Sequence, residues 1–445
     1  MTRPRNLVLL LAATMAVSAS AQERRKVPLR EALQLAAKQG PDVAAARAQA
    51  AVAHAAVDRA WTAWKPDLAA NGTYDHTNGV AIFDFKPIGA LFGLPPDLIA
   101  KFPPPTQIVG QNNWYGTAQL TQPLLTPQGL FGPGAASAGA EAADRGADEA
   151  REQVLLGVAR AYLGLQGIEG LLVAAHEAEK VALRREDDAK ARIFAGTDVE
   201  IALLRAQTET AQARAQIAAL QGQHESLLPL LEALTGEAIA PQPVGTPAED
   251  LGAPASASTE PWEQSFAVKS AQAAAVAAQK ALRISEFAWM PTVAGIAKEN
   301  YTSNEGFVGK NWTYDLMLNV SIPLYDRGTR YAQQHEDSAK LAQAQAQLAS
   351  SRAKARSTWI GAVANLNAAQ AVLEQSQAQA QLAARAQVQV EAAARAGVAT
   401  SLDLSDADQK KFAAQSAAAQ SRAEVDVRRA EVAAAEGRLY SLAAR

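Results

Sequence analysis

The feature that most constrains the fold is an ordered set of short motifs that occurs twice along the chain. In chain order the pairs are Trp64-Lys65-Pro66 with Trp289-Met290-Pro291, Asn113-Trp114 with Asn311-Trp312, Pro123-Leu124 with Pro323-Leu324, and Ala195-Gly196 with Ala396-Gly397. A repeated order of this kind indicates a duplicated structural unit. We therefore expect two repeats, residues 22–234 and 262–445, each built as helix, strand, strand, long helix and helix. Residues 235–261, rich in Pro, Gly, Ala and Ser, are expected to form an irregular equatorial linker between them.

Two proline-free stretches, residues 135–194 and 330–396, predict unusually long helices. At about 1.5 Å per residue they would measure about 90 and about 100 Å, far beyond the helices of ordinary globular domains. Shorter helices are expected at 42–64 and 199–233 in the first repeat and at 262–288 and 403–444 in the second. In each repeat the two short helices together match the long one, which predicts a wall of constant height. Aromatic residues make up only 6% of the chain, which suits elongated helical packing better than one globular core.

Alternation with a period of two predicts β-strands in both repeats, in hairpins expected at 67–121 and 292–322. One face of the segment 312–322 is apolar: Trp312, Tyr314, Leu316, Leu318, Val320 and Ile322. Residues 114–121 alternate in the same way, whereas the partner strands at 67–75 and 292–301 alternate less well. An apolar face opposite a polar face fits a lipid-facing barrel with a wet lumen, and an ordinary half-buried sheet fits the strands equally well.

Four strands are too few to close a β-barrel, because single-chain barrels begin near eight strands. Open strand edges cannot lie in lipid, since their backbone groups would lack partners, so several chains must share one barrel if the strands cross a membrane. An export signal favours the barrel. Residues 1–21 combine Arg3 and Arg5, an apolar run at 7–13 and an Ala-Ser-Ala cleavage site that leaves Gln22 as the first mature residue. The apolar run is too short to act as a membrane anchor instead.

The composition excludes several classes of function. No cysteine is present, which rules out disulfides, thiolate metal sites and cysteine nucleophiles. The net charge of −3 argues against general nucleic-acid binding. The five histidines are scattered, and no nucleotide-binding or nucleophile-elbow motif occurs. We therefore expect no catalytic residue, no cofactor and no metal site, and the protein is not expected to be an enzyme.

Together these motifs resemble those of the TolC family of outer-membrane efflux proteins. Residues 28–37 (PLREALQLAA) look like the family's N-terminal helix, and the paired Trp-x-Pro motifs look like its entries from helix to strand. Gly196 and Gly397 look like the tips of its helical hairpins. The resemblance covers about residues 27–445, and although each motif is weak alone, the ordered duplicate set is specific.

The resemblance implies a mainly α protein with β-structure. It would be the tandem-repeat protomer of a trimeric, twelve-stranded transmembrane β-barrel continuous with a long α-helical barrel in the periplasm. Such a protein lies in the outer membrane and gives passive exit to substrates of a tripartite efflux or type I secretion system. The implied partners are two further copies in a homotrimer, outer-membrane lipid, a periplasmic adaptor (membrane fusion) protein and an inner-membrane pump, without nucleic acid. The alternative is a periplasmic adaptor or coiled-coil structural protein of an export complex, which would not need two β-hairpins with an apolar face.

In that family the hairpin tips form the tunnel entrance and meet the adaptor, and a ring of aspartates narrows the pore. The matching constriction residues are Asp403 and Asp406, whose i, i+3 spacing lets both face the pore, where repulsion between carboxylates would raise their pKa values. The tip residues expected at the adaptor contact are Arg192, Gly196, Thr197, Asp198, Arg395 and Gly397. A structural interpretation stands beside each, because residues 400–403 form a helix capping box and both glycines suit left-handed helix C-caps.

Three positions depart from the family pattern. Ala394 and Ala399 stand where the best-known members carry a Tyr and an Arg that hold the entrance shut, and Ala202 replaces a partnering Asp. Arg192 and Arg395 are candidates for replacing these links, and the way in which the entrance closes stays open.

The loop between the first two strands, residues 76–111, is much longer than its counterpart at 302–310. It is expected on the outer face, where it either folds over the pore mouth or packs on itself, and the second arrangement is slightly favoured. A wide tunnel passes drugs, metal ions, proteins or polysaccharides alike, so the sequence names neither the cargo nor the pump.

Overall fold

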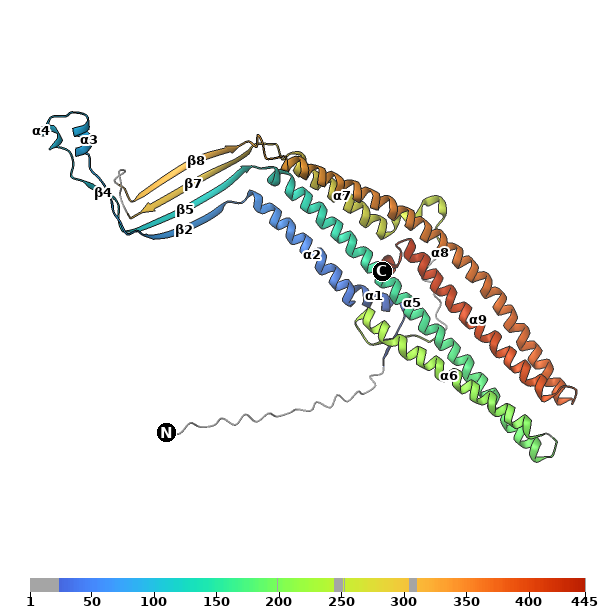
Figure 1. Ribbon diagram of the computed structural model, residues 1–445. Coiled ribbons are helices and arrows are strands. Elements are labelled where there is room, and N and C mark those ends of the chain that lie inside the picture. The colour runs from blue at the N-terminus through green and yellow to red at the C-terminus, as the bar shows by residue number, and fades with distance from the viewer. Residues whose placement is uncertain (1–23, 198, 244–250, 252, 304–309, 445) are drawn as a thin grey trace, which may run out of the picture.

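The computed structural model is a long, bent rod with a small sheet towards one end and helical hairpins at the other (Figure 1). It describes residues 24–197, 199–243, 251, 253–303 and 310–444. The expected signal segment, residues 1–21, and Asp198 lie outside the described residues.

Both repeats contain the predicted order of helix, strand, strand, long helix and helix. The first repeat contains β1 (Arg25–Val27), α1 (Leu29–Gln39), α2 (Pro41–Trp61), β2 (Asp67–His76), β3 (Ala81–Phe83), α3 (Lys86–Leu91), α4 (Pro96–Ile99), β4 (Thr106–Val109), β5 (Asn112–Leu125), α5 (Pro127–Phe194) and α6 (Glu200–Thr235). The second contains β6 (Ile239–Pro241), α7 (Phe266–Glu286), β7 (Thr292–Thr302), β8 (Trp312–Ser321), α8 (Thr329–Arg395), α9 (Ser401–Ala435) and α10 (Leu439–Ala444). The first repeat inserts a folded segment, β3 to β4, between its two long strands, whereas residues 304–309 between the long strands of the second repeat lie outside the described residues.

The first long helix begins earlier than the sequence predicts, at Pro127 rather than at 135, and runs through Pro133. Thr126 caps it, accepting the amide of Gly129 at 2.9 Å. Pro133 has no N–H to donate to the carbonyl of Gly129 four residues before it. The indole Nε1 of Trp64 donates to that carbonyl instead, at 2.7 Å. Trp64, the motif residue that precedes β2, therefore satisfies the acceptor that the proline leaves free.

The last predicted helix, 403–444, is two helices in the structure, which corrects the expectation of one. The break lies at Gly437, whose φ of 66° is left-handed. Its amide donates to the carbonyl of Ala434 at 2.9 Å and the amide of Arg438 donates to Ala433 at 2.8 Å, which terminates α9. A side chain at this position would also stand 3.0 Å from the carbonyl of Gln264, so glycine is required twice over.

The two hairpins form one antiparallel sheet in the order β2-β5-β7-β8. The pairing of β5 with β7 joins the repeats, and β2 and β8 are left as open edges. The sheet is a single layer, so the apolar row on β8 is uncovered: Trp312 60%, Tyr314 78%, Leu316 76%, Leu318 68% and Val320 53% exposed. A row of large apolar side chains without a core beneath it needs an apolar environment from outside the protomer.

The helices form a sheet-like layer with the same two open sides. Near the strands α5 contacts α2 and α7, and towards the tips it contacts α6 and α9 (Figure 1). The second long helix, α8, contacts α7 and α9. The order across the layer is therefore α2, α5, α7 and α8 near the strands, and α6, α5, α9 and α8 towards the tips. The first repeat borders one side and α8 the other, as β2 and β8 border the sheet.

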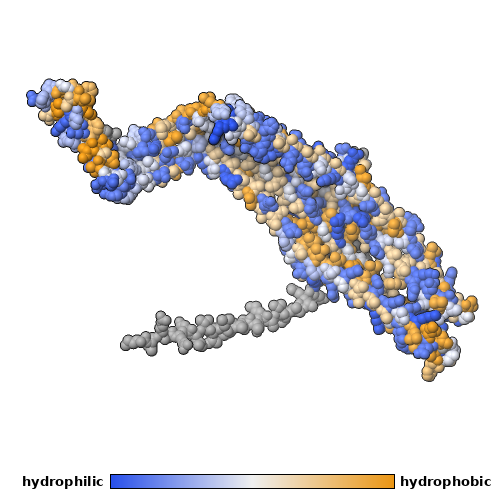
Figure 2. All heavy atoms as spheres, in the orientation of Figure 1, coloured by the Kyte–Doolittle hydropathy of each residue, from blue (hydrophilic) through white to orange (hydrophobic). Residues whose placement is uncertain are grey.

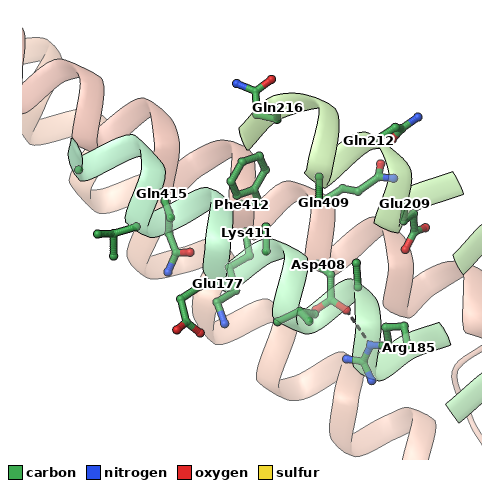
Figure 3. Close-up of a pocket in the computed structure, with 17 residues that line it drawn as sticks. Glu177, Arg185, Glu209, Gln212, Gln216, Asp408, Gln409, Lys411, Phe412 and Gln415 are labelled. Carbon is green, nitrogen blue, oxygen red and sulfur yellow. Dashed lines mark hydrogen bonds and ion pairs between the residues drawn. The ribbon is translucent and has the colours of Figure 1, made fainter. Parts of the chain in front are cut away.

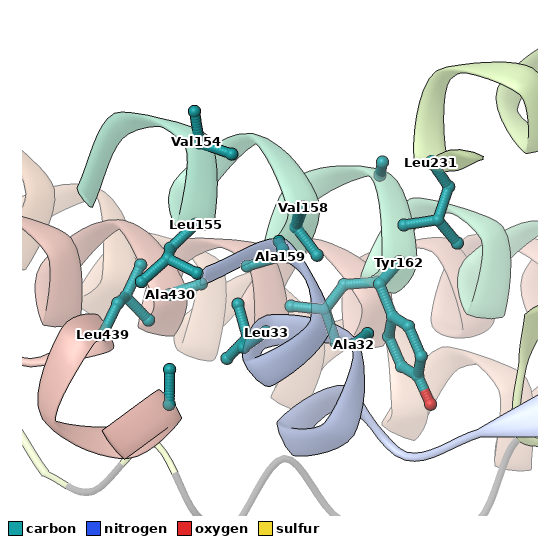
Figure 4. Packing of buried hydrophobic residues seen from close by; sticks show 14 of the residues in the cluster. Ala32, Leu33, Val154, Leu155, Val158, Ala159, Tyr162, Leu231, Ala430 and Leu439 are labelled. Carbon is teal, nitrogen blue, oxygen red and sulfur yellow. The ribbon is translucent and has the colours of Figure 1, made fainter. Parts of the chain in front are cut away.

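The main core lies half-way along α5, where α1, α6, α10 and the end of α9 meet it (Figure 4). Leu155 and Tyr162 of α5 are fully buried there beside Leu33 of α1. The hydroxyl of Tyr162 donates to the carbonyl of Val27 at 2.9 Å, next to the parallel pair β1–β6. Residues 239–241 thus form a strand inside the segment expected to be an irregular linker. The fully buried side chain of Ile239 belongs to this core and holds the strand against it.

Among the described residues, no helix has an apolar stretch long enough to cross a bilayer. The apolar surface gathers instead at the outermost segment around α3 and β4 and at the tip of the α5–α6 hairpin (Figure 2).

Candidate functional site

Both long helices turn back in the same way at the tips. Gly196 and Gly397 have φ values of 72° and 76°, in the left-handed region. After the first helix, the amides of Gly196 and Thr197 donate to Ile193 and Arg192 at 2.9 Å each. After the second, the amide of Gly397 donates to Ala394 at 3.1 Å and that of Val398 donates to Ala393 at 2.9 Å. These are Schellman C-caps, as the paired glycines predict.

The helices that lead away from the two tips start differently. Thr400 caps α9 and forms the predicted capping box with Asp403, its Oγ1 accepting the amide of Asp403 at 3.2 Å. α6 follows Val199, which offers no side-chain cap. The two helices therefore differ at their N-cap residue, which is a threonine with a capping hydroxyl before α9 and an apolar valine before α6.

Asp403 and Asp406 are exposed and one turn apart on α9, while Leu404 and Ala407 point into the protein. Oδ2 of Asp403 accepts from Oγ1 of Thr400 at 2.7 Å and from its amide at 2.9 Å. These hydrogen bonds stabilise the carboxylate and lower the pKa of Asp403 below its ordinary value. Oδ2 of Asp406 pairs with Nζ of Lys410 at 2.7 Å, a partner that we did not expect from the sequence.

Of the two arginines considered as replacement links, Arg395 has its side chain engaged on its own helix, whereas Arg192 lines the small cavity between the hairpins. Arg395 pairs with Glu391 on its own helix at 3.2 Å. The carbonyl of Arg192 accepts the amide and the hydroxyl of Thr197, at 2.9 and 3.0 Å. Ala202 and Ala394, which occupy two of the departing positions, line a small cavity of about 70 Å³ between the hairpins. Where larger side chains would meet across the hairpins, this chain leaves a gap.

A different set of contacts joins the hairpins one level further from the tips (Figure 3). Nε of Arg185 on α5 donates to Oδ2 of Asp408 on α9 at 2.8 Å. The other oxygen of Asp408 accepts from Nε2 of Gln387 on α8 at 3.0 Å. The hydroxyl of Ser405 on α9 donates to Glu209 on α6. We call these five residues the hairpin cluster, because each of the four tip helices contributes to it.

The hairpin cluster is largely shielded from water, with side-chain exposures of 19% for Arg185 and 13% for Asp408. Burial raises the pKa of Glu209, repulsion from Asp408 raises it further, and Arg185 acts in the opposite direction. Arg185, Asp408 and Glu209 thus share a site that is partly shielded from water, in which the positive charge of one arginine stabilises two carboxylates. Removing that arginine would leave the carboxylates facing each other.

A groove of about 610 Å³ runs along α5 next to the hairpin cluster, between α6 and α9. Polar and apolar side chains both line it; those labelled in Figure 3 are Glu177, Arg185, Glu209, Gln212, Gln216, Asp408, Gln409, Lys411, Phe412 and Gln415. Its lining has the mixed character of a water-facing surface. Among the described residues, no group of three or more His, Asp or Glu side chains is arranged to hold a metal ion.

The tips also expose large apolar side chains. Phe194, the last residue of α5, is 96% exposed, and Val398 in the second tip is 82% exposed. Val199, Ile201 and Leu204 continue the apolar surface onto α6. The sequence pointed to the turn glycines and charges here but not to Phe194, although an aromatic residue two positions before a turn glycine is a usable signal. Nothing in the sequence paired Arg185 with Asp408, which are far apart along the chain.

The model of the outer membrane efflux protein family matches residues 32–237 and 260–438. The outer membrane protein VceC from Vibrio cholerae has a similar structure, with a TM-score of 0.73, 18% identity, and coverage of 92% of this chain and 96% of that one. The Neisseria gonorrhoeae MtrE outer membrane channel matches with a TM-score of 0.74, 18% identity, and coverage of 92% and 88%. The Campylobacter jejuni CmeC outer membrane channel matches at 0.74, with 16% identity and coverage of 92% and 85%. No curated protein sequence matches the chain. The predicted fold class is thereby confirmed.

Proposed function

Because the chain belongs to the outer membrane efflux protein family, and is an outer-membrane channel for efflux with a periplasmic helical part, we propose that three copies close into one passive conduit. The observation that carries this proposal is the pair of open edges, β2 and β8, on a single-layer sheet. Unpaired strand edges are not tolerated in lipid, and β8 of one copy can pair with β2 of the next. The alternative of a periplasmic adaptor gains no support from this family membership.

The association of three copies that pairs β8 with β2 would also close the helical layer into a ring. One open side of the layer is formed by α2 and α6, and the other by α8. The helix α2 leads into the edge strand β2, and α8 follows the edge strand β8 (Figure 1). Twelve helices spaced about 9 Å apart make a ring about 35 Å across. Subtracting one helix diameter of about 10 Å leaves a lumen of about 25 Å. A lumen of this width admits hydrated solutes, so discrimination between solutes would take place at the two ends of the conduit.

We place the constriction at Asp403 and Asp406. Both carboxylates are exposed on one face of α9 close to the tip, while the opposite face of the helix is buried. Three copies would contribute six carboxylates, which attract cations and repel anions. Lys410 beside Asp406 offsets part of this charge, so Asp403 would contribute more of the field.

We further propose that the hairpin cluster holds the entrance closed in place of the missing links. Arg185, Asp408, Gln387, Glu209 and Ser405 tie the first hairpin to the second inside one protomer. Outward movement of either hairpin would separate Arg185 from Asp408. The exposed apolar tips around Phe194 and Val398 are suited to bind a periplasmic adaptor, together with Arg192, Gly196, Thr197, Asp198, Arg395 and Gly397. An inner-membrane pump would supply the energy.

The first test is the mass of the particle extracted from outer membranes in mild detergent. A particle of three chains supports the shared barrel, whereas a monomer that is soluble without detergent would refute it.

The second test uses single-channel recording in planar bilayers. Asp403→Asn should lower the preference for potassium over chloride more than Asp406→Asn does, because Lys410 already compensates Asp406. Asp187→Asn, which removes an exposed carboxylate from the other hairpin, is the matched control and should leave selectivity unchanged. Equal selectivity in all three variants would exclude a constriction at these aspartates.

The third test addresses the entrance. Arg185→Gln should raise the conductance or the open fraction, because it removes the charge that holds Asp408 and Glu209 together. Arg214→Gln is the control, since Arg214 pairs with Glu179 within the first hairpin. A conductance of Arg185→Gln equal to that of the parent would show that the hairpin cluster does not close the entrance.

A further inference from the structure

The long loop of the first repeat is a small folded unit. We call residues 80–109 the outer head; it contains β3, α3, α4 and β4 and projects beyond the four-stranded sheet (Figure 1). The strands β3 and β4 pair with each other, and α3 contacts α4. Gly89 is buried against Phe102, and a side chain at position 89 would lie 2.5 Å from the Phe102 ring. The outer head thus has a packing core of its own.

The apolar side chains outside that core are unusually many. Leu91 is 84% exposed and Phe92 is 78% exposed, and Ile82, Ile88, Leu94 and Leu98 are also exposed. Figure 2 shows apolar side chains gathered over this part of the molecule. Its charged residues, Asp84, Asp97, Lys86 and Lys101, balance to zero. A patch of this kind on a stable unit marks a contact surface.

Lipid is not the partner that the geometry favours. The ten residues of β8 extend about 34 Å, or about 25 Å along the membrane normal at a tilt near 40°. That matches the apolar band of an outer-membrane barrel, which is about 25 Å tall. The sheet alone therefore spans the hydrocarbon layer, and the outer head, which continues beyond it, lies in water.

We propose that the outer heads of the three copies pack against one another through Leu91, Phe92 and their apolar neighbours, and so cap the outer mouth of the channel. This inference rests on the proposed trimer. The partner is a second copy because the outer head interrupts the connection from β2 to β5, and β2 is the edge that meets the next copy. The contact between heads therefore continues the contact between strands.

The distances allow the heads to meet. Twelve strands about 4.8 Å apart and tilted by about 40° make a barrel about 24 Å across. A three-residue strand such as β3 already covers about 10 Å, close to the radius. Heads tethered so near to one another have an effective concentration in the millimolar range, so even a weak apolar contact stays formed. With no net charge, the heads do not repel one another.

The test uses the absence of cysteine in the chain, which makes any introduced thiol unique. Leu91→Cys and Phe92→Cys are treated with a short bismaleimide in detergent-extracted particles whose mass has been measured. We expect covalent dimers, since one thiol per chain links two of three copies. Lys101→Cys, an exposed charged position on the same head, is the matched control and should give few dimers.

A second variant gives an independent readout. Leu91→Asp combined with Phe92→Asp should drive the heads apart, speed cleavage by trypsin after Lys101 and raise single-channel conductance. Particles of three chains that give no dimers from either cysteine, and in which the double variant changes neither cleavage nor conductance, would overturn the proposal. A particle of fewer chains would instead refute the proposed trimer, so the two failures are distinguishable.

Discussion

The two long helices, α5 and α8, have nearly equal lengths of 68 and 67 residues but opposite surroundings. α5 is covered on two sides along its whole length and carries the main core, including Leu155 and Tyr162. α8 buries little beyond a stripe around Trp359 and Leu366. A duplicated unit has thus acquired an inner helix, which organises the protomer, and an outer helix, whose free side is available to a neighbouring copy.

The face of α8 that lies opposite its buried stripe is not fully polar. Ile360 and Leu382 are 49% and 65% exposed, and they are separated by about six helical turns, so they share one face. In a closed ring this face meets the first repeat of the next protomer. The difference between α5 and α8 therefore separates stability within a chain from association between chains, and three matched pairs of substitutions test this division.

The largest effect is expected inside α5. Leu155→Ala removes a fully buried side chain and should cost about 3 kcal/mol of unfolding free energy, because it leaves a cavity in the main core. Thermal unfolding followed by circular dichroism measures the loss. Leu382→Ala on α8 is the matched change and should lower the unfolding temperature far less. Equal losses would break the distinction between the two helices.

A similar effect is expected from the pH dependence of Glu152 on α5. Its carboxylate accepts the amides of Leu439 and Tyr440, at 3.1 and 2.9 Å, and burial raises the pKa of Glu152 from 4.5 to about 7. Between these values the folded chain binds a proton that the unfolded chain releases, so this contribution is complete below pH 4.5 and is lost as the pH rises through 7. The full change is about 3 kcal/mol.

Glu152→Gln should flatten that part of the stability profile. Denaturant titrations between pH 5 and about 8 compare the variant with the parent. Glu374→Gln on α8, an exposed position, is the control and should keep the parent's slope. An unchanged slope in Glu152→Gln would assign the dependence to other groups.

A smaller effect, on association alone, is expected on the outer helix. Leu382→Asp places a charge on the free face of α8 and should raise the dissociation constant of the particle about tenfold, which corresponds to about 1.4 kcal/mol. Val173→Asp, at a 66% exposed site on α5 that faces the groove of its own protomer, should leave association unchanged. Mass photometry over a dilution series distinguishes the two. Dissociation of both variants alike would contradict the assignment of α8 as the contact helix.

The smallest effect concerns the two tips. Thr400→Ala removes the cap of α9 and should cost about 1 kcal/mol locally, visible as faster amide hydrogen exchange over residues 401–404. The pKa of Asp403 should rise part of the way towards its ordinary value, because the hydroxyl of Thr400 is lost while the amide of residue 400 still donates to the carboxylate. Val199→Thr introduces a hydroxyl at the N-cap position of α6 and should slow exchange at the start of that helix. Exchange rates that do not respond at either tip would show that capping is not what distinguishes them.

Sequence periodicity and the duplicated motifs were sufficient to predict the long helices, the strand pairs and the turn glycines, because each depends on residues close together in the chain. The break at Gly437 was missed because a single glycine near a helix end does not reveal that Gln264 packs against it. The contact between Arg185 and Asp408 and the strand pair β1–β6 were missed for a related reason. They join segments whose proximity is decided by how the helices stack, which no local pattern encodes.

The bond between Trp64 and Gly129 also determines how the rod bends. A proline inside a helix commonly creates a hinge, yet here bending α5 at Pro133 would pull the Gly129 carbonyl away from the indole that it accepts. This hydrogen bond therefore stiffens the connection between the sheet and the helices. A sideways force on Phe194, about 90 Å further along α5, acts on a helix whose other end is held rigidly. Deflection must then be taken up along the tunnel wall, and the strands in the membrane stay still while the tips move.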